Sequence, residues 1–262
     1  MTPRRIAYLM SRFPNLSETF ILREMIALRD LGWEIEIYPI ILQHPPVIHS
    51  EVQPWLPRVR HSPYLSFKVL AANLRALFRS PRVYLRTALR VVRENASDLN
   101  FFLRALALFP KAVLAAKQIQ AQGVQHIHAH YASHPALMAW IIHQFTGIPY
   151  SITVHAHDIF VRKAMLATKL ADARFIISIS EFNRAYLSRL YGAWVEAKTH
   201  IIHCGVEPQR YPPHAEPPTS LPGLKILSIG SLQPYKGQKY LIEACALLCA
   251  QQIPFECQMI GA

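Results

Sequence analysis

Short apolar runs and stretches with apolar residues every three or four positions alternate along most of the chain. The apolar run at 6–10 predicts a buried strand, and 17–28 has helical spacing behind Ser17, a favourable N-capping residue. Residues 34–38 alternate as a strand does, and we expect that strand to stop at Pro39. This strand, helix, strand unit favours a parallel sheet covered by helices.

The strand pattern is interrupted by a helical region and then resumes. Residues 66–121 predict several helices, with a break at Ser80-Pro81. Further strands are expected at 124–130, 150–154, 175–179 and 201–202, and further helices at 135–145 and after Ser180. We therefore predict an α/β fold whose N-terminal domain, residues 1–210, holds a Rossmann-like, doubly wound parallel sheet.

A proline-rich segment separates this domain from the C-terminal part of the chain. Residues 211–223 contain five prolines and little that could pack, so they predict an interdomain linker. Beyond it, 224–230 predicts a strand, 238–249 a helix and 254–260 another strand. Since about forty residues are too few for an independent α/β domain, we expect 224–262 to be the truncated start of a second Rossmann-like domain.

Positive charge is concentrated in one part of the chain. The formal net charge is +12, and residues 56–122 alone hold twelve Lys and Arg against two acids, Glu94 and Asp98, a net +10. Such a basic insertion implies an anionic partner: phosphates, an acidic membrane surface or nucleic acid. Aromatic residues do not alternate with the basic ones as in single-strand or RNA binders, so we expect no nucleic-acid partner.

Arginine recurs at helical spacing within this insertion, on two consecutive helices. These arginines form a basic stripe: Arg75, Arg79, Arg82, Arg86, Arg90 and Arg93. A solvated helix face and a contact surface for an anionic membrane or ligand are the alternatives. Acids that would pair with such a face are almost missing from the insertion.

The sequence carries no secretion or membrane-spanning signal. The run at 6–10 is too short for a signal peptide, and no uninterrupted apolar stretch approaches the roughly 20 residues of a spanning helix. None of the four cysteines forms a C-x-x-C pair. We expect a cytoplasmic chain that is soluble or peripheral on a membrane face.

Polar residues follow the carboxyl ends of the predicted strands, where doubly wound sheets bind ligands. They are Ser17, Glu18 and Thr19 after the first strand, His130 after the 124–130 strand, His155 and Asp158 after the 150–154 strand, and Ser180 and Glu181 after the 175–179 strand. A hydrogen-bonding site for a sugar or phosphate is the preferred interpretation. Ordinary polar loop or core histidines are the alternative.

The histidines also permit a metal hypothesis. His126, His128 and His130 would share one strand face, and His155 and His157 could approach them from the neighbouring strand. A metal-dependent hydrolase is therefore a second candidate function. Later strands supply no obvious further ligands, and we predict no metal site.

A turn in the second domain has the composition of a phosphate-binding loop. Gly230, Ser231 and Gly237 lie in the turn from the 224–230 strand to the next helix, and Lys236 stands at the entrance of that helix. Its charge would add to that of the free backbone N–H groups. A plain strand-to-helix turn is the alternative.

Together these segments resemble the family 4 retaining glycosyltransferases of the GT-B fold, especially bacterial enzymes of colanic acid and other exopolysaccharide synthesis. Six motifs in the family's order carry the resemblance: Phe13-Pro-Asn-Leu-Ser-Glu-Thr-Phe20, His128-Ala-His130, Thr153-Val-His-Ala-His-Asp158, Ile179-Ser-Glu-Phe-Asn183, His203-Cys-Gly-Val206 and Gly230-Ser-Leu-Gln-Pro-Tyr-Lys-Gly237.

The resemblance implies a hexosyltransferase-type enzyme that moves a sugar from a nucleotide-diphosphate donor to an acceptor with retention and without a metal or other cofactor. By the family pattern, His155 is the catalytic residue near the reacting carbon. Lys236 holds the donor diphosphate, helped by Gly230, Ser231, Gly237, Ser180 and Glu181. Ser17, Glu18, Thr19, His130 and Asp158 line the acceptor side of the cleft.

Two departures from the family pattern stand out. Ser231 occupies the position where members commonly have an arginine that binds the diphosphate. The family's pair of glutamates spaced eight apart would lie beyond residue 262, so the chain as written is expected to bind donor poorly.

In exopolysaccharide assembly, the resemblance further implies a lipid-linked saccharide acceptor at the inner membrane face. The basic stripe would then dock on an anionic membrane surface. A non-catalytic membrane-binding module is the third candidate function.

Overall fold

The computed structural model describes residues 4–161, 163–210 and 223–261. The chain divides into two compact units, Met1–Gly205 and Val206–Ala262. The predicted linker at 211–223 lies outside the described residues, except for Gly223.

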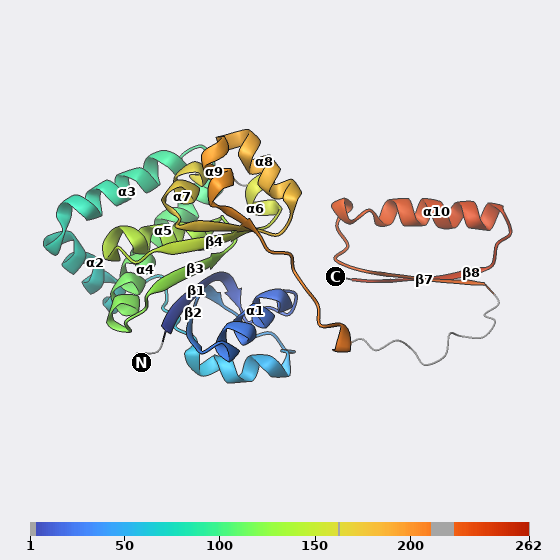
Figure 1. Cartoon of the computed structure of the whole chain (residues 1–262), viewed down its shortest axis with the longest axis horizontal. Helices are drawn as coiled ribbons and strands as arrows, with labels where there is room; N and C mark the ends of the chain where they lie inside the picture. Colours follow the sequence, from blue (N-terminus) through green and yellow to red (C-terminus); the bar gives the residue numbers. More distant parts are fainter. Residues whose placement is uncertain (1–3, 162, 211–222, 262) are drawn as a thin grey trace. The chain divides into compact units, whose positions relative to one another are not determined.

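The first unit is built on a six-stranded sheet in the order β2-β1-β3-β4-β5-β6, in which every neighbouring pair is parallel (Figure 1). The strands are β1 (Arg4–Phe13), β2 (Trp33–Leu42), β3 (His126–His130), β4 (Tyr150–Val154), β5 (Phe175–Ser178) and β6 (Thr199–Ile201). Each overlaps a segment where the sequence predicted a strand, and the α/β prediction for this unit is confirmed.

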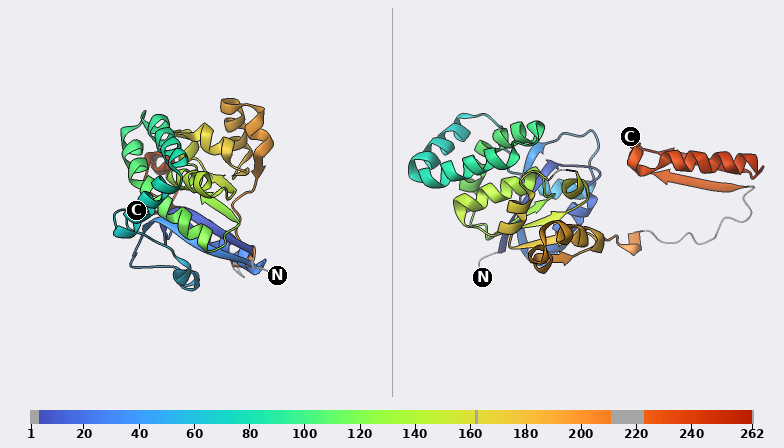
Figure 2. Two further views of the ribbon diagram at one scale, coloured as in Figure 1. Left: turned by 90° about the vertical axis from the view of Figure 1, so that its left-hand side faces the viewer. Right: turned by 90° about the horizontal axis from the view of Figure 1, so that it is seen from above.

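Helices cover both faces of the sheet, as the two views in Figure 2 show. One core lies between the sheet and α1 (Thr19–Asp30) with the 3-10 helix η1 (Ser50–Arg58). The larger core lies on the opposite face. Its helices include α4 (Leu99–Ala121), α5 (His134–Thr146), α7 (Leu166–Asp172), α8 (Glu181–Tyr191) and α9 (Ala193–Lys198). Tyr8 belongs to the first core and its neighbour Leu9 to the second, so β1 is apolar without alternation.

Several local signals act as the sequence predicted. Ser80-Pro81 separates α2 (Phe67–Arg79) from α3 (Pro81–Asn95). The Ser180 hydroxyl accepts the Asn183 N–H at 3.2 Å and caps α8. The helix predicted at 135–145 is α5, which Gly147 ends with φ 70°.

Two expectations near the first strand unit were wrong. The helix α1 begins at Thr19 with Glu18 as its N-cap, while the Ser17 hydroxyl donates to Asn15 Oδ1 within the loop. Strand β2 continues through Pro39 to Leu42. Proline is tolerated there because β2 is an edge strand of the sheet.

Helices α2 and α3 pack against α4 with few buried residues on each. The buried residues are Val69, Ala72 and Asn73 on α2 and Thr87, Val91 and Asn95 on α3. Large apolar side chains face outward instead: Phe67 is 85% exposed and Phe78 81%. The predicted helices are therefore correct, but their apolar side chains do not form a conventional buried stripe.

Among the described residues, α4 is the one helix long and apolar enough to cross a membrane. Ala105, Leu108 and Ala112 on this helix are buried in the larger core, and 56% of its apolar window is buried. Core helices of folded domains meet the same criteria of length and composition.

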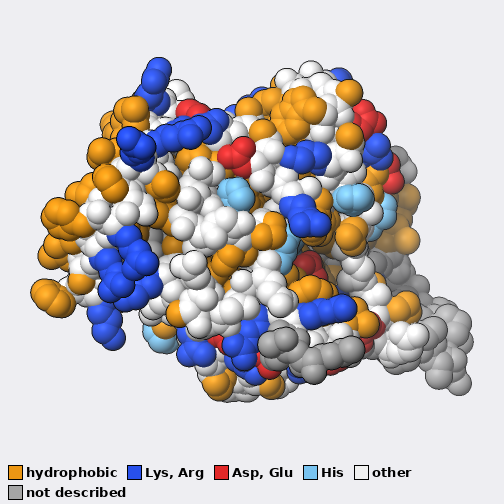
Figure 3. Space-filling model, turned by 60° about the vertical axis from the view of Figure 1, so that its left-hand side comes forward, with side chains coloured by type: hydrophobic (Ala, Val, Ile, Leu, Met, Phe, Trp, Pro, Cys, Tyr) orange, Lys and Arg blue, Asp and Glu red, His pale blue; other side chains and the backbone are white. Residues whose placement is uncertain are grey.

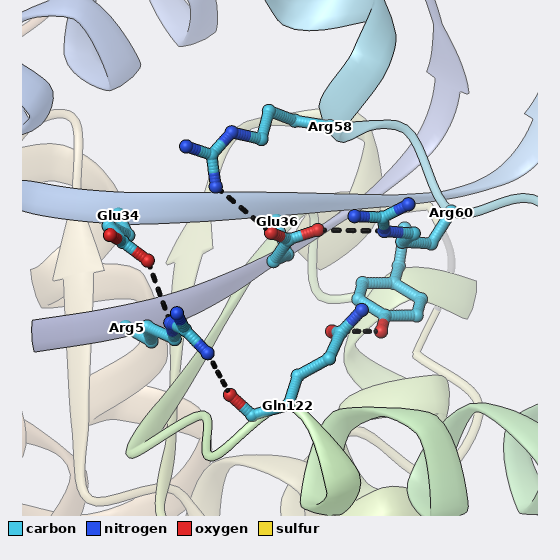
Figure 4. A network of polar contacts seen from close by, with 7 residues as sticks. Arg5, Glu34, Glu36, Arg58, Arg60 and Gln122 are labelled. Carbon is cyan, nitrogen blue, oxygen red and sulfur yellow. Dashed lines mark hydrogen bonds and ion pairs between the residues drawn. The ribbon is translucent and has the colours of Figure 1, made fainter. Parts of the chain in front are cut away.

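Ion pairs fix the outer edge of the sheet (Figure 4). Glu36 on β2 is 6% exposed and accepts from Arg58 Nη1 at 3.2 Å and from Arg60 Nε at 2.9 Å. Arg5 Nε on β1 donates to Glu34 Oε2 at 2.7 Å. Two arginines of the basic insertion are thus already paired.

The second unit contains the predicted strand, helix and strand. They are β7 (Leu224–Ile229), α10 (Gln238–Ala250) and β8 (Phe255–Ile260), and the two strands pair in parallel. A 3-10 turn, η3 (Pro234–Lys236), precedes α10, and Gly237 between them has φ 77°. Glycine suits that left-handed position, because a Cβ there is strained.

Candidate functional site

In the sheet, β2 lies on one side of β1 and β3 lies on the other, so the strand order reverses between β1 and β3. In doubly wound sheets the crevice beyond such a point is the usual ligand site. The loops after β1, β3 and β4 meet there. We call the residues they bring together the carboxyl-edge cluster: Glu18, His130, Tyr131 and His155.

Glu18 and Tyr131 join the first two loops across the crevice. The Tyr131 hydroxyl donates to Glu18 Oε1 at 3.1 Å. Burial raises the pKa of the Glu18 carboxyl, although the hydrogen bond from Tyr131 opposes the shift. Tyr131 has φ 75°, an uncommon left-handed conformation for a large residue at the end of a strand.

His155 lies at the centre of the cluster. Its ring centroid is 4.5 Å from that of Tyr131, 5.1 Å from Phe20 and 6.0 Å from His130. The side chain is 9% exposed, and its buried Nε2 has no hydrogen-bond partner among the described residues. Burial, together with the neighbouring His130, lowers the pKa of His155 to about 4, so the His155 imidazole is neutral at pH 7.

The main chain of His155 is fixed from two sides. Its N–H donates to Asp158 Oδ1 at 3.0 Å, and its carbonyl accepts from Asn183 Nδ2 at 2.6 Å. Asp158 also accepts the Ala132 N–H at 2.7 Å and is 2% exposed. Asp158 was expected to line the acceptor cleft, but its carboxylate is instead committed to two loop backbones.

A second group lies behind His155 and was missed by sequence analysis. Glu24 Oε1 is 3.6 Å from both His128 Nε2 and His130 Nε2, and it accepts the Tyr8 hydroxyl at 2.5 Å. We call Glu24, His128 and His130 the histidine–glutamate group. The sequence did carry a signal for Glu24: it follows the buried Ile21 by three residues on α1, which places it on the same side of that helix.

Burial would raise the pKa of Glu24, but the His130 and His128 imidazoles and the Tyr8 hydroxyl outweigh it and lower the pKa to about 2. Burial and the neighbouring His130 lower the pKa of His128 to about 3. At neutral pH the group therefore holds a carboxylate beside the neutral His128 imidazole.

The histidines do not assemble as the metal hypothesis expected. His126 bonds Ser151 Oγ at 2.8 Å and stacks on Phe175, while His157 is exposed on α6 (His157–Phe160). His128 and His130 come together, with Glu24 in place of the other histidines.

Ser180 contributes to the cluster indirectly. Its hydroxyl caps α8 by accepting the Asn183 N–H, and the Asn183 side chain donates to the His155 carbonyl. Glu181 is exposed, 3.5 Å from His203 Nε2. Thr19 begins α1 next to Glu18.

The predicted phosphate loop lies in the second unit. Lys236 ends the η3 turn directly before α10, with its amine 5.6 Å from the Tyr235 ring centroid. Ser231 offers its carbonyl to Gln238 Nε2 at 2.9 Å, and Gly230 follows β7. The turn thus has a cation at the entrance of a thirteen-residue helix.

The basic stripe divides into five exposed arginines and one bound one. Arg90 donates to Glu94 Oε1 at 2.6 Å and Thr168 Oγ1 at 3.1 Å, and its guanidinium lies 5.7 Å from the Trp140 ring centroid. Arg90 is thus held against the protein, although its side chain is still 39% exposed. The exposed members are Arg75, Arg79, Arg82, Arg86 and Arg93.

Exposed apolar side chains stand beside these arginines. Figure 3 shows hydrophobic and basic side chains intermixed on the side that comes forward, with few acidic ones. We call this the α2–α3 surface. Its most exposed apolar members are Leu65, Phe67, Leu70, Phe78, Leu85 and Leu89.

Comparison with known proteins gives a family match for part of the chain. Residues 84–210 match Glycosyltransferase Family 4. The matched segment contains His130, Tyr131 and His155, three of the four residues of the carboxyl-edge cluster, and also Asp158. No curated protein sequence matches the chain.

Solved structures give the fold. A glycosyltransferase from Rickettsia africae has a TM-score of 0.57 at 16% identity, covering 98% of this chain and 60% of its own. Sucrose-phosphate synthase from Thermosynechococcus elongatus has a TM-score of 0.59 at 18% sequence identity, and the match covers 99% of this chain and 62% of that chain. HepE of Anabaena, solved in complex with UDP-glucose, has a TM-score of 0.52 at 13% sequence identity, and the match covers 98% of this chain and 69% of that chain. The fold is of the GT-B type, and the chain spans about three-fifths of the first two structures.

Proposed function

We propose that the protein carrying this chain is a retaining, hexosyltransferase-type glycosyltransferase that acts in bacterial exopolysaccharide synthesis. It would move a sugar from a nucleotide-diphosphate donor to a lipid-linked or oligosaccharide acceptor. The observation that carries the proposal is His155, a rigidly held, neutral imidazole with a free Nε2 in the segment that matches family 4. The UDP-glucose bound by HepE supports a nucleotide-sugar donor.

Sugar transfer from a nucleotide-diphosphate donor requires groups that hold the sugar and groups that stabilise the leaving diphosphate. His155 Nε2 suits the first task, because a neutral imidazole can hydrogen-bond a hydroxyl near the reacting carbon. Lys236 and the N–H groups at the start of α10 suit the second, since charge grows on the diphosphate as the bond breaks. No metal or cofactor is required for these roles.

A metal-dependent hydrolase is less well supported, because His126 and His157 lie apart from the histidine–glutamate group. A purely non-catalytic module would leave the constrained carboxyl-edge cluster without a purpose.

The α2–α3 surface supports a peripheral position on the cytoplasmic face of the membrane. Five exposed arginines would meet anionic headgroups, and Phe67 and Phe78 would enter the headgroup region. A lipid-linked acceptor would then reach the enzyme by diffusion in the membrane plane.

Transfer assays on the full-length protein with a panel of nucleotide sugars and lipid-linked acceptors test the proposal. His155→Ala should lower kcat by at least about a hundredfold, because a contact at the reacting centre is lost. His157→Ala, an exposed histidine two residues away, is the matched control and should keep nearly full activity. Equal rates for His155→Ala and the unaltered protein would contradict the assignment.

A further inference from the structure

The histidine–glutamate group joins two elements that are far apart in sequence. Glu24 projects from α1, and His128 and His130 project from one face of β3. His128 is 3% exposed and His130 0%, while the Glu24 side chain is 36% exposed. The group therefore has two buried imidazoles and one carboxylate that solvent can reach.

The protein offers His130 a long ion pair with Glu24 but no well-formed hydrogen bond. Neither of its ring nitrogens has a hydrogen-bond partner among the described residues. Its Nε2 faces the Glu24 carboxylate, whose Oε1 lies 3.6 Å away, too far for a well-formed hydrogen bond. A fully buried polar side chain without a partner is costly, and a bound ion is one of the ordinary reasons for finding one.

The spacing fits a tetrahedral metal ion. Metal bonds of about 2.1 Å at tetrahedral angles put neighbouring ligand atoms about 3.4 Å apart. Glu24 Oε1 lies 3.6 Å from each imidazole Nε2, and the ligand atoms of the group all fall within 4.8 Å of one another. Two nitrogens and one oxygen suit Zn²⁺ and similar divalent transition metals.

The surrounding residues are arranged as supports of metal ligands usually are. His128 Nδ1 lies 2.7 Å from Ser151 Oγ, which fixes the ring with Nε2 toward the group. The Tyr8 hydroxyl holds the Glu24 carboxylate. Thr153 Oγ1 lies 3.0 Å from His128 Nε2, and its hydroxyl can rotate to leave that lone pair free.

We propose that Glu24, His128 and His130 bind one Zn²⁺-class ion, with water in the fourth position. The ion links α1 to β3 behind His155 and satisfies the buried His130. We assign the ion a structural role, and its binding is measured without the transfer reaction, so the test of the site does not depend on the proposed function.

Metal binding by the purified chain, freed of metal with a chelator, tests the site. Zn²⁺ titrated against a chromophoric competitor should show one tight equivalent, and Co²⁺ should give the intense visible bands of tetrahedral coordination. Glu24→Gln, which keeps the side-chain volume, and His130→Asn should each weaken binding at least tenfold. His157→Asn, on an exposed histidine outside the group, should leave the affinity unchanged.

Circular dichroism of each metal-free variant shows whether it is folded, and Glu24→Gln remains a valid test if His130→Asn does not fold. Absence of a stoichiometric site, or equal affinity in Glu24→Gln and the unaltered chain, would overturn the proposal. Failure of glycosyl transfer would leave it standing.

Discussion

Two regions of the first unit gather polar and charged side chains in opposite ways. In the carboxyl-edge cluster they lie close together, the Tyr131 hydroxyl donates to Glu18, and Asp158 fixes the His155 backbone. On the α2–α3 surface five arginines point outward beside exposed phenylalanines, without carboxylate partners among the described residues. The first arrangement suits a rigid site for a small molecule. The second suits a broad anionic surface that has no fixed geometry.

Removal of the Asp158 carboxylate should give the largest difference between the two regions. Asp158→Ala leaves the buried N–H groups of Ala132 and His155 without an acceptor, and we expect a loss of about 3 kcal/mol in the free energy of unfolding. Arg86→Ala on the exposed surface should cost less than about 0.5 kcal/mol. Urea denaturation measures both, and similar midpoints would contradict the contrast.

Lowering the pH should reduce the stability of the protein through its buried histidines and not through the exposed arginines. Burial keeps the pKa values of His126, His128 and His155 at about 4, 3 and 4, below the ordinary 6.5. The unfolded chain therefore binds more protons than the folded chain below pH 6.5, and stability falls with pH down to about 4. Between pH 7 and pH 6 we expect a loss of about 2 kcal/mol.

Thermal unfolding of the metal-free protein at constant ionic strength measures this loss, which should shrink in His128→Gln. A melting temperature that stays level from pH 7 to pH 5 would show that these imidazoles are not buried as neutral groups.

Single charges on the α2–α3 surface should have the smallest effect. Arg86→Gln should weaken binding to phosphatidylglycerol-containing vesicles about fivefold, corresponding to about 1 kcal/mol per basic residue near a membrane. The loss should diminish as salt is added. Arg29→Gln, on α1, is the matched control. Vesicle sedimentation measures both, and equal losses would indicate attraction by net charge alone.

Sequence patterns predicted the elements where short-range chemistry decides the structure. The Ser180 cap and the Ser80-Pro81 break act through neighbouring residues, so they can be recognised without knowledge of the fold. The end of β2 was misplaced, because the tolerance for Pro39 depends on β2 being at the edge of the sheet.

The candidate site was only partly predictable for the same reason. His155 and Glu18 follow strands, and parallel topology brings strand ends together. Glu24 comes from the middle of a helix, and its distance to His128 and His130 depends on how α1 packs on the sheet. Arg90 matched its stripe in spacing, yet Glu94 and Trp140 hold it against the protein.

The ion-paired edge strand β2 has a consequence for solubility. An open strand edge can recruit strands from other chains and start aggregation. On β2, Pro39 has no N–H to offer, the Ile37 carbonyl already accepts the Arg60 N–H at 2.7 Å, and Glu36 places a carboxylate clasped by two arginines beside it. The sheet thus ends on a side where an approaching strand finds few backbone groups to bind, which protects a chain rich in exposed apolar residues from self-association.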